Sequence, residues 1–127
     1  MGLPLYGRQW PTSSSDVPGT ATGDGTAFVM SEAIAYADQY GSSYDATTHT
    51  PYVLESNKQL WYCDKDSVQT RVSWAVDEGL QGIGFWALDY ELGVDGFWEM
   101  IQSETVLTPS EPSAEPSTEP SAEPSTE

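Results

Sequence analysis

The ten residues 82–91 constrain the fold more than any other part of this sequence. They read Gly-Ile-Gly-Phe-Trp-Ala-Leu-Asp-Tyr-Glu and carry no charge before Asp89. A short apolar run of this length is typical of a fully buried β-strand. The two-residue period of a strand places Trp86 on one face with the glycines, and Phe85 on the opposite face with Ile83 and Ala87.

This pattern fits a strand of a parallel barrel. The glycine face is bare at its start, as a crowded barrel interior requires, and the Phe85 face suits a covering layer of helices. Trp86 then lies near the carboxyl end, followed by Asp89 and Glu91, where such barrels carry their chemistry. The alternative interpretation is that Trp86 is an ordinary core aromatic.

Residues 2–8 predict a second buried strand with a similar pattern. Leu3 and Leu5 fall on one face, and Gly2, Pro4, Tyr6 and Arg8 fall on the other. Two such strands are expected to be adjacent and parallel, with a crossover helix on their outer face.

The segments between and after these strands give the rest of the predicted order. The sequence predicts a loop over 10–25, a helix over 26–40, a hairpin of strands 51–54 and 59–63, a helix over 66–78 and a short helix over 96–101. Thr26 or Asp24 is the expected cap of the first helix and Gly41 its end. Asp66 and Gln69 form a capping-box pattern for the second helix.

Charge and cysteine content exclude several classes of protein. Residues 1–108 hold fifteen acidic side chains against four basic ones, a net charge of −11, and the whole chain reaches −16. Nothing here attracts nucleic acid or an anionic membrane surface, so neither is an expected partner. Cys63 is the single cysteine, which excludes a disulfide framework or zinc spacing and indicates a core residue. No cofactor is expected.

The last nineteen residues, 109–127, differ in composition from the rest. They contain only Pro, Ser, Glu, Ala and Thr, and an eight-residue repeat runs over 111–118 and again over 119–126. Such a segment has nothing to bury, so we expect a disordered, extended linker. The predicted division is therefore a folded part over 1–108 and a linker over 109–127.

Several motifs resemble the glycoside hydrolases of family 18, the chitinase-like enzymes. Residues 2–8, Gly-Leu-Pro-Leu-Tyr-Gly-Arg, resemble the seventh barrel strand of that family. Residues 61–67, the helix behind them and residues 82–88 resemble its last helix-strand pair. Tyr44-Asp45 and Pro51-Tyr52 resemble its small α+β insertion. Together with Trp10-Pro11, this order is most similar to bacterial members acting on chitin-like or peptidoglycan glycans.

The resemblance implies an α/β fold: a partial (β/α)8 barrel, comprising its last two strands and helices, with an α+β insertion and a disordered C-terminal tail. It implies substrate-assisted cleavage of β-1,4 bonds next to N-acetylglucosamine. By position, Trp86 resembles the floor under the scissile sugar, and Tyr6 and Arg8 match residues near the glycan cleft. For Arg8, bracing a loop is the alternative. The glycan is the implied partner, the location is secreted or cell-surface, and the tail would tether the chain to another domain or the cell surface.

One departure from the family pattern bears on activity. The Asp-x-x-Asp-x-Asp-x-Glu motif that carries the catalytic acid is absent from these 127 residues, and so is the Tyr-Asp of strand six. We therefore interpret the chain as the C-terminal quarter to third of a catalytic domain plus its linker, inactive alone and without a catalytic residue of its own. The alternatives are a carbohydrate-binding module using Trp10, Trp61 and Trp86, a non-catalytic chitinase-like lectin, and an α+β domain with a polar tail.

Overall fold

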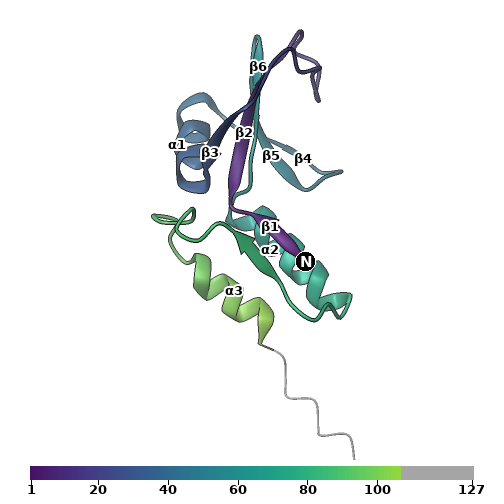
Figure 1. Cartoon of the computed structure of the whole chain (residues 1–127), viewed down its shortest axis with the longest axis vertical. Coiled ribbons are helices and arrows are strands. Elements are labelled where there is room, and N and C mark those ends of the chain that lie inside the picture. Colours follow the sequence, from purple (N-terminus) through teal and green to yellow (C-terminus); the bar gives the residue numbers. More distant parts are fainter. Residues whose placement is uncertain (107–127) are drawn as a thin grey trace, which may run out of the picture.

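The computed structural model describes residues 1–106, which form two sheets and three helices (Figure 1). A two-stranded sheet pairs β1 with β7, and a five-stranded sheet has the order β3-β2-β6-β5-β4. The elements in chain order are β1 (Gly2–Pro4), β2 (Tyr6–Pro11), β3 (Thr26–Val29), α1 (Met30–Tyr40), β4 (Ser43–Asp45), β5 (Thr50–Glu55), β6 (Lys58–Trp61), α2 (Lys65–Asp77), β7 (Gly84–Trp86) and α3 (Phe97–Thr105).

The two-stranded sheet confirms that the two glycine-rich strands are parallel neighbours. Gly2 pairs with Gly84 and Pro4 with Trp86, and the Leu5 N–H continues the ladder to the Trp86 carbonyl oxygen at 2.7 Å. Helices α2 and α3 cover one face of the pair (Figure 1). The buried residues of this core are Leu3, Leu5, Met30, Cys63, Val68, Val72, Phe97 and Met100.

The sequence predictions for these two strands were too long. Strand 2–8 divides at Leu5, because the Leu5 carbonyl accepts the Met30 N–H and the chain then enters the other sheet as β2. In the second stretch only β7 is strand, and it is half-buried at Phe85 and exposed at Gly84 and Trp86. Trp86 is 70 % exposed, since nothing in residues 1–106 covers the glycine face.

The helix α2 lies on the outer face of the strand pair, as predicted. Its cap differs from the prediction, because the chain at Asp64 is extended and the helix begins at Lys65. The Asp64 carboxylate accepts the Ser67 N–H at 2.8 Å, and Ser67 Oγ accepts the Asp64 N–H at 3.0 Å. These two bonds form the capping box that the sequence pattern assigned to Asp66 and Gln69. Beyond the helix, Gly79 has the predicted left-handed backbone, with φ +65°.

The five-stranded sheet corresponds to the predicted insertion and carries α1 on one face. Its core consists of Ala33, Ala37, Val53, Leu60 and Tyr62. The hairpin is confirmed: Glu55 pairs with Lys58, so the turn is only two residues long. Gly41 ends α1 as predicted, its N–H donating to the Ala37 carbonyl at 2.8 Å.

Two other boundaries were predicted wrongly. Residues 26–29 form strand β3 rather than the first turn of a helix, because they pair with β2 over Tyr6–Gln9; neither Thr26 nor Asp24 caps α1. Trp10 and Pro11 belong to β2 rather than to a loop, since they pair with Gln59 and Lys58. In both places cross-strand pairing outweighs local propensity.

The predicted linker 109–127 lies outside the described residues. Within residues 1–106, the helices are all too short and too polar to cross a membrane.

Candidate functional site

Trp86 stands on the uncovered face of the two-stranded sheet. Its carbonyl is held by Leu5, while its side chain is largely exposed. The neighbouring Phe85 points the other way and contacts Phe97 and Trp98 edge-on, with ring centroids 5.9 and 5.8 Å apart. Because neighbouring side chains of a strand point to opposite faces, the packing of Phe85 against α3 directs Trp86 to the uncovered face.

Glu91 follows β7 at its carboxyl end and is only 6 % exposed. One carboxylate oxygen, Oε1, accepts the Trp98 indole N–H at 3.1 Å. The other, Oε2, is buried without a hydrogen-bond partner in the described structure. Glu91 is thus buried and held in place by Trp98.

Tyr6 and Arg8 lie in the other sheet, on β2. Tyr6 is half-buried, and Arg8 is exposed. Arg8 donates to the Gly25 carbonyl at 2.8 Å, and its guanidinium lies 5.1 Å from the Trp10 ring centroid. These contacts support the loop-bracing alternative for Arg8 and join it to Trp10.

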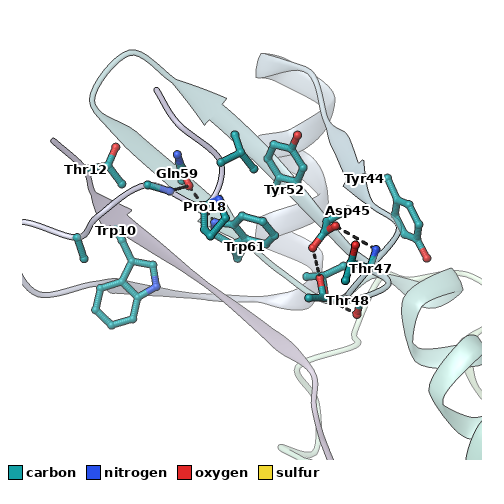
Figure 2. Close-up of a pocket in the computed structure, with 14 residues that line it drawn as sticks. Trp10, Thr12, Pro18, Tyr44, Asp45, Thr47, Thr48, Tyr52, Gln59 and Trp61 are labelled. Atoms are coloured by element: carbon teal, nitrogen blue, oxygen red, sulfur yellow. Dashed lines mark hydrogen bonds between the residues drawn. The ribbon is translucent and has the colours of Figure 1, made fainter. Parts of the chain in front are cut away.

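The structure brings Trp10, the neighbour of Arg8, together with residues that the site prediction did not include. The face of the five-stranded sheet opposite α1 carries a groove of about 1020 Å³, which we call the sheet groove (Figure 2). It is lined by Trp10, Thr12, Tyr44, Asp45, Tyr52, Gln59 and Trp61, together with residues of the 17–21 and 47–50 loops. Trp61 pairs across the strands with both Arg8 and Tyr52.

The aromatic centre of the sheet groove is the stacked pair Tyr52 and Trp61. Their ring centroids are 4.7 Å apart and their planes are 23° apart. In Figure 2, Trp10 lies to one side of this pair, and Asp45 and Tyr44 lie to the other. The order follows the strands, from β2 through β6 and β5 to β4. Three strand spacings make this row about 14 Å long.

Gln59 lines the groove and holds two of its parts together through the hydrogen bonds of its side-chain amide. It is buried, and its Oε1 accepts both the Gly19 N–H at 3.0 Å and the Trp61 indole N–H at 3.1 Å. Its amide nitrogen donates to the Asp16 carbonyl at 2.5 Å. The amide therefore ties the 16–19 loop to Trp61 and occupies the Trp61 indole N–H, while Tyr52 stacks on the Trp61 ring.

Asp45 supplies a carboxylate at the opposite end. It accepts the Thr48 hydroxyl at 2.6 Å and the Thr47 N–H at 3.0 Å. These hydrogen bonds, that of Thr48 first, lower the pKa of Asp45 from its ordinary value. The groove therefore carries a fixed negative charge at neutral pH.

Metal chemistry finds no support in the described part of the chain. Among residues 1–106 no three His, Cys, Asp or Glu side chains are grouped so as to hold a metal ion. Cys63 is buried, and burial raises the pKa of its thiol, which fits the predicted core role.

The three predicted site residues belong to two sheets, and the chain passes from one sheet to the other at Leu5, whose N–H bonds the Trp86 carbonyl and which Tyr6 follows directly. Trp86 lies on the small sheet, and Tyr6 and Arg8 lie on the large one. The sequence prediction of the site missed Gln59 and Tyr52. The two-residue period of a strand could have indicated Gln59. It places Gln59 and Trp61 of β6 on the same face of the sheet, opposite to the core face of Leu60 and Val53.

Comparison with known families identifies the group to which this fold and these motifs belong. Residues 1–91 match the family described as "Glycosyl hydrolases family 18". The chain belongs to family 18 of the glycosyl hydrolases. A search of curated proteins found no match.

Solved structures similar to the chain are chitinases and a chitinase-like protein. A mutant chitinase from Cycas revoluta in complex with (GlcNAc)4 is 26 % identical, with a TM-score of 0.66, over 82 % of this chain and 32 % of that one. A class V chitinase from Nicotiana tobaccum is 19 % identical, with a TM-score of 0.67, over 83 % and 34 %. Human YKL-39, a pseudo-chitinase with retained chitooligosaccharide binding, is 17 % identical, with a TM-score of 0.70, over 82 % and 34 %. The chain thus spans about a third of the length of these proteins.

Proposed function

We propose that this chain is the C-terminal part of a family 18 glycosidase that cleaves β-1,4 bonds of N-acetylglucosamine-containing glycans. The observation that carries the proposal is the family match over residues 1–91. The parallel pair β1 and β7, with α2 and α3 on one side only, supports a place among the last strands of a (β/α)8 barrel. The exposed Trp86, Leu88 and Leu92 are side chains that the rest of a barrel would cover or use.

The proposed mechanism is substrate-assisted and retaining. The acetamido oxygen of the sugar attacks the anomeric carbon while an enzyme carboxylic acid protonates the leaving glycosidic oxygen; water then opens the cyclic intermediate, giving its proton to the same carboxylate. The acid lies in the part of the barrel that these 127 residues do not include. Trp86 contributes an apolar ring surface beneath the reacting sugar, which positions the ring and excludes water.

A second candidate is a binding protein without hydrolytic activity. The similarity to human YKL-39 favours it, because that pseudo-chitinase shows that the fold accommodates binding alone. The two candidates differ in the catalytic acid. Both place an N-acetylglucosamine glycan as the partner and fit a secreted or cell-surface location, with the 109–127 segment as a tether.

The test is to express the chain together with the reading frame upstream of Met1. We expect that frame to encode the acidic motif and the product to hydrolyse a chromogenic N-acetylglucosamine oligomer. Trp86→Ala should lower kcat roughly 100-fold because the sugar loses its position, whereas Trp74→Ala, an exposed tryptophan on α2, should leave kcat unchanged. An upstream frame without the acidic motif, and a product that binds but does not cleave, would favour the binding protein instead.

A further inference from the structure

We propose that the sheet groove is a second glycan-binding site, separate from Trp86, and that it takes an uncharged β-1,4-linked N-acetylglucosamine oligomer. The inference rests on the proposed substrate class. It adds a place on the chain, the face of the insertion sheet opposite α1, to which no role has been assigned.

Aromatic side chains line the sheet groove. A pyranose ring has a C–H-rich face that packs on a flat aromatic surface, and Tyr and Trp combine such a surface with a polar edge. Trp10, Trp61 and Tyr52 line the groove from three successive strands. Two strand spacings separate the first of these strands from the last, about 9.5 Å, and the groove continues to Tyr44 and Asp45 on β4, so it has room for more than one linked sugar unit.

The groove is pre-formed, because contacts within the chain hold its side chains in place. The Gln59 amide binds the 16–19 loop and the Trp61 indole at once, and Tyr52 stacks on Trp61. Holding these side chains in place before binding reduces the entropy that a ligand must overcome.

Polar side chains and one carboxylate surround the aromatic centre of the groove. The hydroxyls of Thr12 and Thr50 donate to the Ser14 and Thr48 carbonyls, so they can accept a hydrogen bond from a sugar hydroxyl. The Thr47 hydroxyl and the Tyr44 phenol, which bonds His49 Nδ1, also line the groove. Asp45 stays ionised at neutral pH and can accept from a hydroxyl or acetamido N–H. The same charge, within a chain of net charge −16, disfavours a glycan that carries carboxylates.

The test follows the five tryptophan indole N–H signals of the 127-residue chain by NMR during titration with the N-acetylglucosamine tetramer. We expect the Trp10 and Trp61 signals to shift with saturation. Trp61→Ala should weaken binding about tenfold or more, the effect of losing one stacking surface. Trp74→Ala is the matched control and should bind as the unaltered chain does. Retained dispersion of the other four indole signals shows that each variant is folded.

A second variant avoids any change at the sheet centre. Asp45→Asn keeps an acceptor for the Thr47 N–H and removes the charge. We expect it to reduce the preference for the tetramer over a tetramer containing N-acetylmuramic acid at least threefold.

Three outcomes would overturn the inference. One is that no indole signal shifts. Another is that only Trp86 shifts, and that Trp86→Ala rather than Trp61→Ala abolishes binding. The third is that the carboxylate-bearing glycan binds more tightly than the uncharged one. The second of these outcomes would not contradict the proposed glycosidase activity. That proposal fails only if the longer protein does not hydrolyse the glycan.

Discussion

At the scale of single residues, close contacts decide what the chain tolerates. Gly7 lies in β2 against the chain that leaves β6. A methyl group there would meet Tyr62 Cβ at 2.5 Å and the Trp61 carbonyl oxygen at 2.9 Å. Both atoms are held by the sheet and its core, so neither can move aside. This close approach explains why a glycine stands between Tyr6 and Arg8.

We predict that Gly7→Ala destabilises the chain by about 1–3 kcal/mol, the usual cost of overpacking. Urea unfolding followed by tryptophan fluorescence measures this free energy. Gly2→Ala is the matched control, because a methyl group at Gly2 meets nothing within 4 Å; it should change stability by less than about 0.5 kcal/mol. Equal effects of the two substitutions would show that the contact with Tyr62 is unimportant.

The residue scale also shows what the sequence could and could not predict about the site. The outward position of Trp86 follows from period two and the apolar character of Phe85, and both were readable. The placing of Tyr6 and Arg8 in a different sheet from Trp86 was not, because it depends on where Leu5 directs its backbone hydrogen bonds. The role of Gln59 needed a loop forty residues away, which no local pattern reveals.

At the scale of elements, helix α2 covers the strand pair, and its residues Val68 and Val72 share one core with Leu3 and Leu5. Its type and direction were predictable from the apolar stripe of Val68, Val72 and Ala75. Its first residue was not, since the capping choice between Asp64 and Asp66 is decided by the extended backbone that leaves β6. Likewise, the strand β3 looked helical until its pairing with β2 was known.

We predict that Asp64→Ala destabilises the chain by about 1 kcal/mol, because it removes the acceptor for the Ser67 N–H. Asp66→Ala is the matched control and should stay within about 0.5 kcal/mol, since Asp66 caps nothing. Chemical denaturation gives both values. A larger loss at Asp66 than at Asp64 would contradict the cap seen in the structure and restore the sequence-based assignment.

Helices α2 and α3 are joined by one carboxylate, which makes their contact sensitive to pH. Glu104 accepts the Ser73 hydroxyl at 2.5 Å and the Gln69 amide at 2.6 Å. These bonds, with Ser73 first, lower the pKa of Glu104. A lowered folded-state pKa means that the contact stabilises the fold above the unfolded pKa, about 4.3, and that this stabilisation is lost as the pH falls below it.

We therefore predict that Glu104→Gln reduces the loss of stability between about pH 5 and pH 3. Thermal unfolding at a series of pH values measures this, with Glu99→Gln on the same helix as the control. An unchanged pH profile for Glu104→Gln would mean that the two hydrogen bonds do not distinguish the charged from the neutral carboxyl.

At the scale of the whole molecule, the chain consists of a sheet with its own core and a strand pair covered on one side. The order of elements and the parallel pairing were predictable because glycine-rich strands and a crossover helix leave few topologies. The pairing of β2 with the insertion sheet was not predictable. A single strand over 2–8 and two strands in different sheets both satisfy the same alternation of side chains.

We propose that these residues supply binding surfaces of a family 18 site and that its acid lies outside them. The most direct measurement is an assay of the purified 127-residue chain on a chromogenic N-acetylglucosamine oligomer, alongside the binding titration. The account predicts binding without hydrolysis above the blank, because general-acid help worth typically 10²–10⁴-fold is missing. Hydrolysis that follows the chain through purification and disappears in Glu91→Gln or Asp89→Asn would contradict it, since the acid would then lie within this chain.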